Sequence, residues 1–104
     1  MGYVYLIEDN VQKAYKIGVT RSNNLKRLKS LQTGNANELK IIFLFETEYP
    51  FRLETILHNM YRDYKIMNEW YDIYDIEEFK RNCEAANDNI IALKDNPFFN
   101  KNLK

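Results

Sequence analysis

The sequence predicts an α+β domain, in which a small antiparallel β-sheet with a three-stranded core and a short additional strand is flanked by helices. Three observations predict it. Two β-forming stretches near the N-terminus are joined by a polar turn, a nearly continuous apolar run follows, and apolar residues at helical spacing fill the second half. The 104 residues suit one domain with one core. We assign residues 1–95 to this domain and residues 96–104 to a polar C-terminal tail.

The first two strands are expected to form an antiparallel hairpin. Gly2–Ile7 and Ala14–Thr20 are rich in β-forming residues, and Glu8–Lys13 supplies a turn that contains Asn and Asp. Because side chains alternate between the two faces of a strand, the hairpin should have one core face and one opposite face. The core face holds Val4, Leu6, Tyr15, Ile17 and Val19. The opposite face holds Tyr3, Tyr5, Lys16 and Gly18.

A short helix and a third strand are expected next. Ser22 and Asn23 suit the N-cap of this helix, and Gly34 suits its end. Its inner face carries Leu25, Leu28 and Leu31. Leu39–Phe45 is an almost continuous apolar run, which is typical of a central strand buried on both faces.

Two further helices and one more strand complete the expected order. Pro50 fits the first turn of a helix. The residues of this helix expected to face the core are Leu53, Leu57, Met60 and Tyr64. Trp70–Tyr74 predicts a last strand, and Asp75 with Glu78 forms a capping box for a helix that extends to about Lys94. The buried stripe of that helix should be Phe79, Cys83, Ala86 and Ile90.

Composition excludes several classes of protein. One cysteine, Cys83, allows no disulfide framework, and with the single histidine, His58, it cannot supply the usual four zinc ligands. Gly18 and Gly34 lie outside phosphate-binding loop patterns, so nucleotide hydrolysis has no support. No apolar stretch approaches the ~20 residues that cross a bilayer. We therefore expect no membrane partner and a cytoplasmic protein, or a nuclear one in a eukaryotic host.

Charge is balanced overall but unevenly distributed. Residues 11–40 carry seven basic residues and one acidic residue, whereas residues 41–80 carry four basic and nine acidic residues. A basic segment beside an acidic one suits a polyanion bound together with a cation, although two ordinary solvated faces give the same pattern. On the first interpretation, nucleic acid would contact Lys16, Arg21, Lys26, Arg27 and Lys29.

A few side chains are candidates for chemistry at a phosphate. Glu54 and His58 are four residues apart, so they share a helix face beside the apolar stripe. A carboxylate there can bind one Mg²⁺ while phosphate and water complete the octahedron. Arg27 offers a planar set of donors that suits phosphate, and Lys16, on the same side as Tyr5, could hold phosphate or lower the pKa of the phenol. Each is also a common surface residue, so only their joint order carries weight.

That order resembles the GIY-YIG nuclease superfamily over roughly residues 2–74. The motifs are GYVYLI, then YKIG, then NLKRL, then a helix with LE-x-x-x-H, then EWY. The resemblance is to a divergent phage- and virus-associated branch whose second motif reads KIG, with Lys16 in place of its tyrosine. It implies a GIY-YIG-like fold and matches Tyr5, Arg27 and Glu54 to the family's motif positions. Leu31 stands where many members carry a histidine, and the late asparagine has no clean match, although Asn68 lies close.

The resemblance implies a metal-dependent endonuclease that hydrolyses phosphodiester bonds in nucleic acid, with DNA favoured over RNA and Mg²⁺, or Mn²⁺, as cofactor. Tyr5 would activate the nucleophile, Arg27 would offset charge on the phosphate, and Glu54 would hold the metal. We add Lys16, which would favour the phenolate and bind phosphate, and His58 to this catalytic set. Specificity would come from a homodimer or from a partner protein.

Two other functions stay open. A GIY-YIG fold that binds nucleic acid with weak or no catalysis is favoured by Leu31 and by the neutral net charge. A protein-interaction domain would use the acidic half of the chain. Tyr5, Arg27 and Glu54 favour the endonuclease, because a pure binding module does not need a lone metal-binding carboxylate.

Overall fold

The structure is a computed structural model that describes residues 1–21 and 38–94. Within these residues, antiparallel strands form one five-stranded sheet in the order β3-β1-β2-β5-β4. The strands are β1 (Gly2–Asp9), β2 (Ala14–Thr20), β3 (Leu39–Thr47), β4 (Lys65–Met67) and β5 (Trp70–Tyr71). The helices are α2 (Pro50–Met60) and α3 (Ile76–Leu93), with a 3₁₀ turn at Arg62–Tyr64. The predicted α+β class is confirmed.

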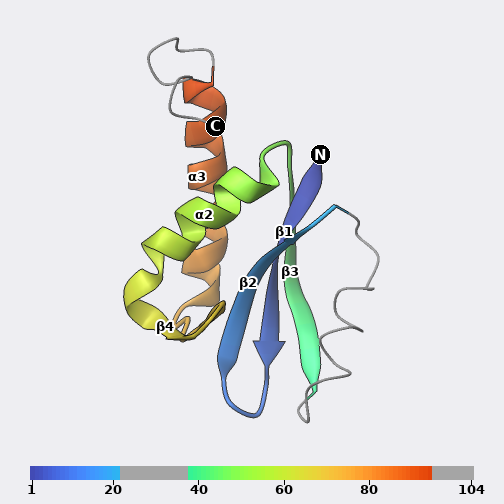
Figure 1. Ribbon diagram of the computed structural model, residues 1–104, viewed down its shortest axis with the longest axis vertical. Coiled ribbons are helices and arrows are strands. Elements are labelled where there is room, and N and C mark those ends of the chain that lie inside the picture. Colours follow the sequence, from blue (N-terminus) through green and yellow to red (C-terminus); the bar gives the residue numbers. More distant parts are fainter. Residues whose placement is uncertain (22–37, 95–104) are drawn as a thin grey trace.

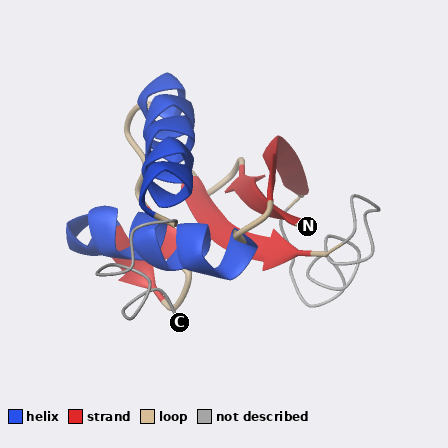
Figure 2. Cartoon of the chain, turned by 90° about the horizontal axis from the view of Figure 1, so that it is seen from above, coloured by secondary structure: helices blue, strands red, loops and turns tan. Residues whose placement is uncertain are grey.

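The two helices cross one another and lie on the same side of the strands (Figures 1 and 2). The main core fills the space between them and the sheet, and a smaller buried cluster of Tyr5, Ile7 and Leu39 lies apart from it. None of the helices in the described ranges is long and apolar enough to cross a membrane. The expected helix with Leu25, Leu28 and Leu31 falls outside the described residues, and so does the tail at 96–104.

The β1–β2 hairpin has the predicted turn and the predicted faces. In the turn, Asp9 Oδ1 accepts backbone N–H bonds from Val11 and Gln12, each 3.1 Å long. The register places Leu6 opposite Ile17 and Tyr5 opposite Gly18. The residues predicted for the core face, which are Val4, Leu6, Tyr15, Ile17 and Val19, all belong to or pack against the main core. The opposite face therefore carries Tyr5, Lys16 and Gly18, as expected.

The third strand exists, but its predicted central position is wrong. In the described part of the sheet, β3 is an edge strand that pairs with β1. Phe43 and Phe45 are partly buried against the core, whereas Leu44 points away and is 37% exposed. Strands β1, β2 and β5 have neighbours on both sides, and it is β1, next to β3, whose residues are mostly buried. A continuous apolar run shows that a strand is hydrophobic but does not show how many strands pair with it.

Helix α2 begins at Pro50 as predicted and buries Leu53 and Leu57 completely. The expectation that Met60 and Tyr64 face the core is wrong, because they are 45% and 55% exposed. Met60 is the last residue of the helix, so helical spacing no longer places Tyr64 on the face of Leu53 and Leu57. Tyr61 enters the core instead, and its ring centroid lies 5.4 Å from that of Phe79.

The C-terminal helix follows its prediction closely. Asp75 is the N-cap of α3 and accepts the backbone N–H of Glu78 at 3.0 Å. All four residues of the predicted stripe are buried, namely Phe79, Cys83, Ala86 and Ile90. The helix ends at Leu93, within one residue of the expected Lys94.

The last strand is shorter than predicted and has an unpredicted partner. Only Trp70–Tyr71 of the expected Trp70–Tyr74 is a strand, and it pairs with both β2 and β4. The turn before it contains Asn68, whose φ of 54° lies in the left-handed region that Asn tolerates. All three residues of β4 are exposed, so the strand has no buried apolar face that the sequence could reveal.

Candidate functional site

Helix α2 carries polar side chains on the flank that faces β2. Leu53 and Leu57 fix the helix on the core, and Glu54 and His58 each follow one of these leucines. One residue further along a helix is a rotation of about 100°, so both side chains lie at the rim between α2 and the sheet. They are only 19% and 23% exposed.

Two hydrogen bonds hold the imidazole of His58 in place. Its Nδ1 is bonded to the hydroxyl of Tyr71, and its Nε2 lies 3.2 Å from the carbonyl oxygen of Ile17 in β2. Burial raises the pKa of the Tyr71 phenol, with smaller contributions from the charges of Glu69 and Glu54. The hydroxyl therefore stays protonated and donates a hydrogen bond to Nδ1 of His58. The Nε2–H then donates to Ile17. This arrangement also keeps Nε2 3.6 Å from Glu54 Oε2.

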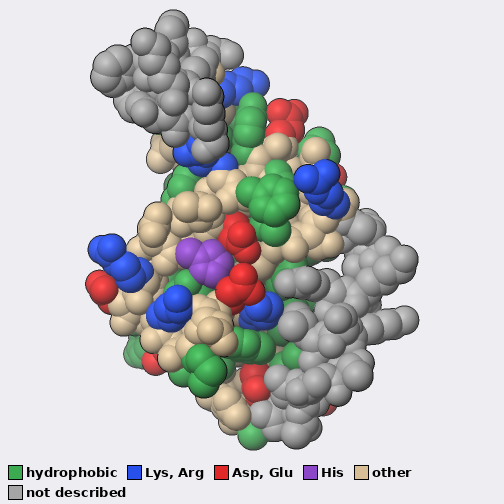
Figure 3. Space-filling view, in the orientation of Figure 1, with side chains coloured by type: hydrophobic (Ala, Val, Ile, Leu, Met, Phe, Trp, Pro, Cys, Tyr) green, Lys and Arg blue, Asp and Glu red, His purple; other side chains and the backbone are tan. Residues whose placement is uncertain are grey.

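A second carboxylate comes from Glu69, in the turn just before β5. Glu69 forms an ion pair with Lys16, whose strand neighbour in β5 is Trp70. Glu54, His58 and Glu69 each offer one ligand atom, and these atoms all lie within 4.8 Å of one another. We call Lys16, Glu54, His58 and Glu69 the polar cluster. Figure 3 shows the face on which a histidine lies beside acidic and basic side chains.

Charge and burial oppose each other within the polar cluster. Burial raises the pKa of the Glu54 carboxyl above its usual range. The neighbouring His58 lowers the pKa of Glu54, and so does Lys16 to a smaller extent. The charge of Glu69 raises it further. A divalent cation would relieve the repulsion between the two carboxylates. Carboxylate oxygens are the hard ligands that Mg²⁺ and Mn²⁺ prefer, so the donor set fits such an ion. His58 fits it less well, because both of its ring nitrogens already make hydrogen bonds.

Tyr5 lies in β1 opposite Gly18 of β2, on the same face of the sheet as Lys16. A Cβ atom on Gly18 would overlap the hydroxyl and ring of Tyr5, so only glycine allows the phenol to lie this close to the strand. Gly18 follows Ile17, whose carbonyl oxygen accepts the bond from His58. The Tyr5 side chain is buried, at 1% exposure.

The structure brings together Lys16, Glu54 and His58 from the predicted site, and Tyr5 lies on the neighbouring strand. Arg21 follows the end of β2 and lies elsewhere, with its guanidinium carbon 5.7 Å from the ring centroid of Phe51. Sequence reasoning did not assign Glu69 a role in the site, although Glu69 opens the EWY motif before the aromatic strand. The basic candidates outside the described residues are Lys26, Arg27 and Lys29.

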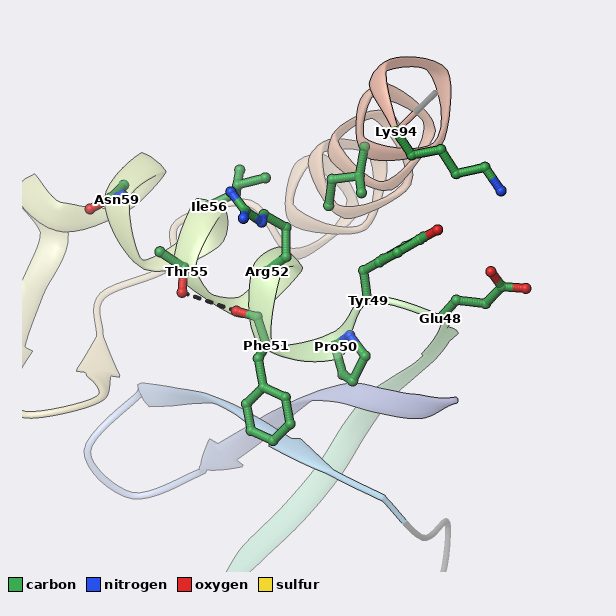
Figure 4. Close-up of a pocket in the computed structure, with 10 residues that line it drawn as sticks. Glu48, Tyr49, Pro50, Phe51, Arg52, Thr55, Ile56, Asn59 and Lys94 are labelled. Atoms are coloured by element: carbon green, nitrogen blue, oxygen red, sulfur yellow. Dashed lines mark hydrogen bonds between the residues drawn. The ribbon is translucent and has the colours of Figure 1, made fainter. Parts of the chain in front are cut away.

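A hollow lies on the opposite flank of α2 and contains none of the predicted site residues. Its volume is about 540 Å³, and Arg52, Thr55 and Asn59 line one side of it (Figure 4). These positions lie about 100–160° around the helix from Glu54, by the ~100° per residue of an α-helix. The polar cluster, and not this hollow, therefore holds the groups suited to chemistry.

Relatives of this chain come from viruses. It is 30% identical to uncharacterized protein R865 of Acanthamoeba polyphaga mimivirus over 79 residues, which are 76% of this chain and 13% of that protein. It is 31% identical to uncharacterized protein 460R of Invertebrate iridescent virus 6 over 102 residues, which cover 91% of this chain and 45% of that protein. The chain thus spans less than half the length of either relative. No solved structure matches it.

The family match covers nearly all of the described fold. Residues 2–88 match the T5orf172 domain, from the first residue of β1 to well inside α3. This domain is associated with phages, viruses and nuclease-like proteins. The match also includes the elements that supply every residue of the polar cluster. Because it covers well over half of the sequence, the chain belongs to the T5orf172 domain family.

Proposed function

We propose that this domain is a metal-dependent endonuclease that hydrolyses phosphodiester bonds in nucleic acid, with DNA favoured over RNA. The observation that carries the proposal is the polar cluster, in which ligand atoms of Glu54, His58 and Glu69 lie within 4.8 Å of one another and Lys16 pairs with one of the carboxylates. The T5orf172 match supports it at the level of a nuclease-like family. The resemblance of the YVY and KIG motifs to GIY-YIG nucleases supports the finer assignment.

Glu54 would hold the Mg²⁺ or Mn²⁺ ion. Its carboxylate is partly shielded from solvent, and His58 fixes its surroundings through Tyr71 and Ile17. The bound ion supplies positive charge that stabilises the leaving oxygen. In this scheme His58 is a positioning residue, because its hydrogen bonds are made within the protein.

The remaining groups would act on the water and the phosphate. Tyr5, buried beside Gly18, would as a phenolate take a proton from the attacking water, or as a neutral phenol orient that water by a hydrogen bond. Lys16 would bind a phosphate oxygen after leaving its ion pair with Glu69. Arg27 would offset the charge that develops on the phosphate. Backbone phosphates further along the nucleic acid would be bound by Arg21, Lys26, Arg27 and Lys29.

A cleavage assay tests this proposal. Purified protein is incubated with plasmid, single-stranded DNA and RNA in the presence of Mg²⁺, Mn²⁺ or EDTA. Cleavage is expected with metal and not with EDTA, and Glu54→Gln or Arg27→Ala should each slow it by about 10²–10³-fold. Glu77→Gln is a matched control, because Glu77 is an exposed helix residue whose partner is Lys80 in α3. If Glu54→Gln and Arg27→Ala cut as fast as the control, the site assignment is wrong.

A binding module without catalysis is the second candidate, and the Lys16–Glu69 ion pair favours it, since that pair occupies the amine that would contact phosphate. In this case the parent protein would cut nothing under any metal but would still bind nucleic acid. Arg27→Ala should then weaken binding and flatten its salt dependence by about one phosphate contact. Gel-shift titrations at several salt concentrations separate the two candidates.

A further inference from the structure

Lys16 is buried in a place where it needs an anionic partner. Its side chain is 8% exposed, and its backbone lies between Ile7 of β1 and Trp70 of β5. A buried ammonium that loses its counter-ion leaves an uncompensated charge, which is strongly destabilising. Lys16 can therefore release Glu69 only when another anion replaces it.

Glu69, in contrast to Lys16, has a side chain that can change its conformation. Its side chain is 43% exposed and starts from the turn between β4 and β5, so it can rotate without disturbing the core. Its ligand oxygen already lies within 4.8 Å of a ligand oxygen of Glu54. Two carboxylates at this spacing can converge on one divalent cation, since cation–oxygen distances are about 2.0–2.6 Å.

We infer that Glu69 is a second metal-binding carboxylate beside Glu54, and that Lys16 withholds it until a phosphate arrives. The exchange replaces one ion pair with two: Lys16 takes a phosphate oxygen, and Glu69 turns to the cation held by Glu54. Metal and phosphate therefore bind with positive cooperativity. This inference rests on the proposed phosphate and metal site but does not require that the protein cleaves anything.

The coupling must be reciprocal, because it is an equilibrium property. Phosphate should lower the Mn²⁺ concentration needed for half-saturation, and Mn²⁺ should lower the phosphate concentration by the same factor. Allosteric couplings typically amount to ~5–150-fold, and about tenfold is expected here. Without Glu69, the metal would be held by Glu54 alone, and phosphate could tighten its binding only by direct contact with the ion.

Mn²⁺ binding can be measured directly, by electron paramagnetic resonance of the free ion, with and without diethyl phosphate. This probe is a phosphodiester that resists hydrolysis, and NaCl keeps the ionic strength constant. In the parent protein, diethyl phosphate should tighten Mn²⁺ binding about tenfold. Glu69→Gln should weaken Mn²⁺ binding when diethyl phosphate is present and should remove most of the tenfold effect of phosphate. Lys16→Met should give tight Mn²⁺ binding that no longer responds to phosphate.

Glu77→Gln serves as the control and should leave both affinities unchanged, because it lies in an exposed ion pair on α3. Circular dichroism checks that each variant is folded. If Glu69→Gln, which leaves the Lys16 ammonium without its counter-ion, does not fold, the double variant Lys16→Met/Glu69→Gln removes both charges and should bind Mn²⁺ weakly, without a response to phosphate. If Glu69→Gln binds Mn²⁺ and responds to phosphate like the parent, the inference is overturned, while an endonuclease that uses Glu54 still stands. Coupling without any cleavage would support the inference and overturn the proposed endonuclease activity.

Discussion

The two described helices pack on the same core but differ in what else they carry. Helix α3 has 18 residues, is capped by Asp75, and contributes no member of the polar cluster. Helix α2 has 11 residues, begins without a side-chain cap in the described structure, and carries Glu54 and His58. Packing on the core thus has two consequences: in α3 it stabilises the fold, and in α2 it also positions polar side chains.

The difference comes from the neighbours of each helix. The flank of α2 beside its core leucines meets the backbone of β2, so a polar residue there finds partners such as the Ile17 carbonyl. Helix α3 packs on α2 and on aromatic residues of β3, including an edge-on contact between Phe79 and Phe43 with ring centroids 6.2 Å apart. Substitutions in α3 should therefore change stability, and those on the flank of α2 should change chemistry.

The largest effect is expected from Phe79→Ala in α3. Phe79 is fully buried and contacts both Phe43 and Tyr61, so its loss should leave a cavity and lower the free energy of unfolding by ~3–5 kcal/mol. Urea titration followed by circular dichroism measures this change. Mn²⁺ affinity of the protein that remains folded should not change. A stable Phe79→Ala variant would contradict the structural role of α3.

A smaller and different effect is expected from His58→Ala on α2. Loss of a residue that orients a metal ligand typically costs ~10–100-fold in metal affinity or activity, so half-saturation should require about tenfold more Mn²⁺. The unfolding free energy should change by only ~1 kcal/mol, since the side chain is partly exposed. His58→Gln should partly restore Mn²⁺ affinity, because its amide can donate to the Ile17 carbonyl. Equal Mn²⁺ affinity in the parent, His58→Ala and His58→Gln would show that His58 does not orient the metal ligand.

The smallest effect at neutral pH concerns Cys83 in α3. Burial, with a smaller contribution from Glu84, raises the pKa of the thiol to about 12, compared with 9.0 for an ordinary thiol. The folded state therefore keeps a proton that the unfolded state loses, so stability is unaffected below pH 9 and falls as pH rises toward 12. The unfolding free energy of the parent should decrease from pH 9 to 10.5 more steeply than that of Cys83→Ala. Parallel pH profiles would contradict the burial of this thiol.

Local features of the sequence were enough to predict several parts of this molecule. The hairpin, the start of α2 at Pro50 and the N-cap at Asp75 depend on neighbouring residues, and each is confirmed. The closeness of Glu54 and His58 was predictable for the same reason, because helical spacing alone places them on one face. The roles assigned to Tyr5, Arg27 and the other site residues stay predictions.

Only the tertiary structure decided which segments meet. The pairing order puts Leu39–Thr47 at an edge and β5 beside β2, and this brings Glu69 to Lys16 across 53 positions of sequence. The end of α2 at Met60 likewise directs Tyr61, and not Met60 or Tyr64, into the core. Periodicity reports which face of an element is apolar, but the choice of neighbour depends on how all the elements pack together. The sequence by itself therefore determined β1, β2, β3, α2, α3 and the Glu54–His58 pair, whereas packing decided that Glu69 and Lys16 complete the polar cluster.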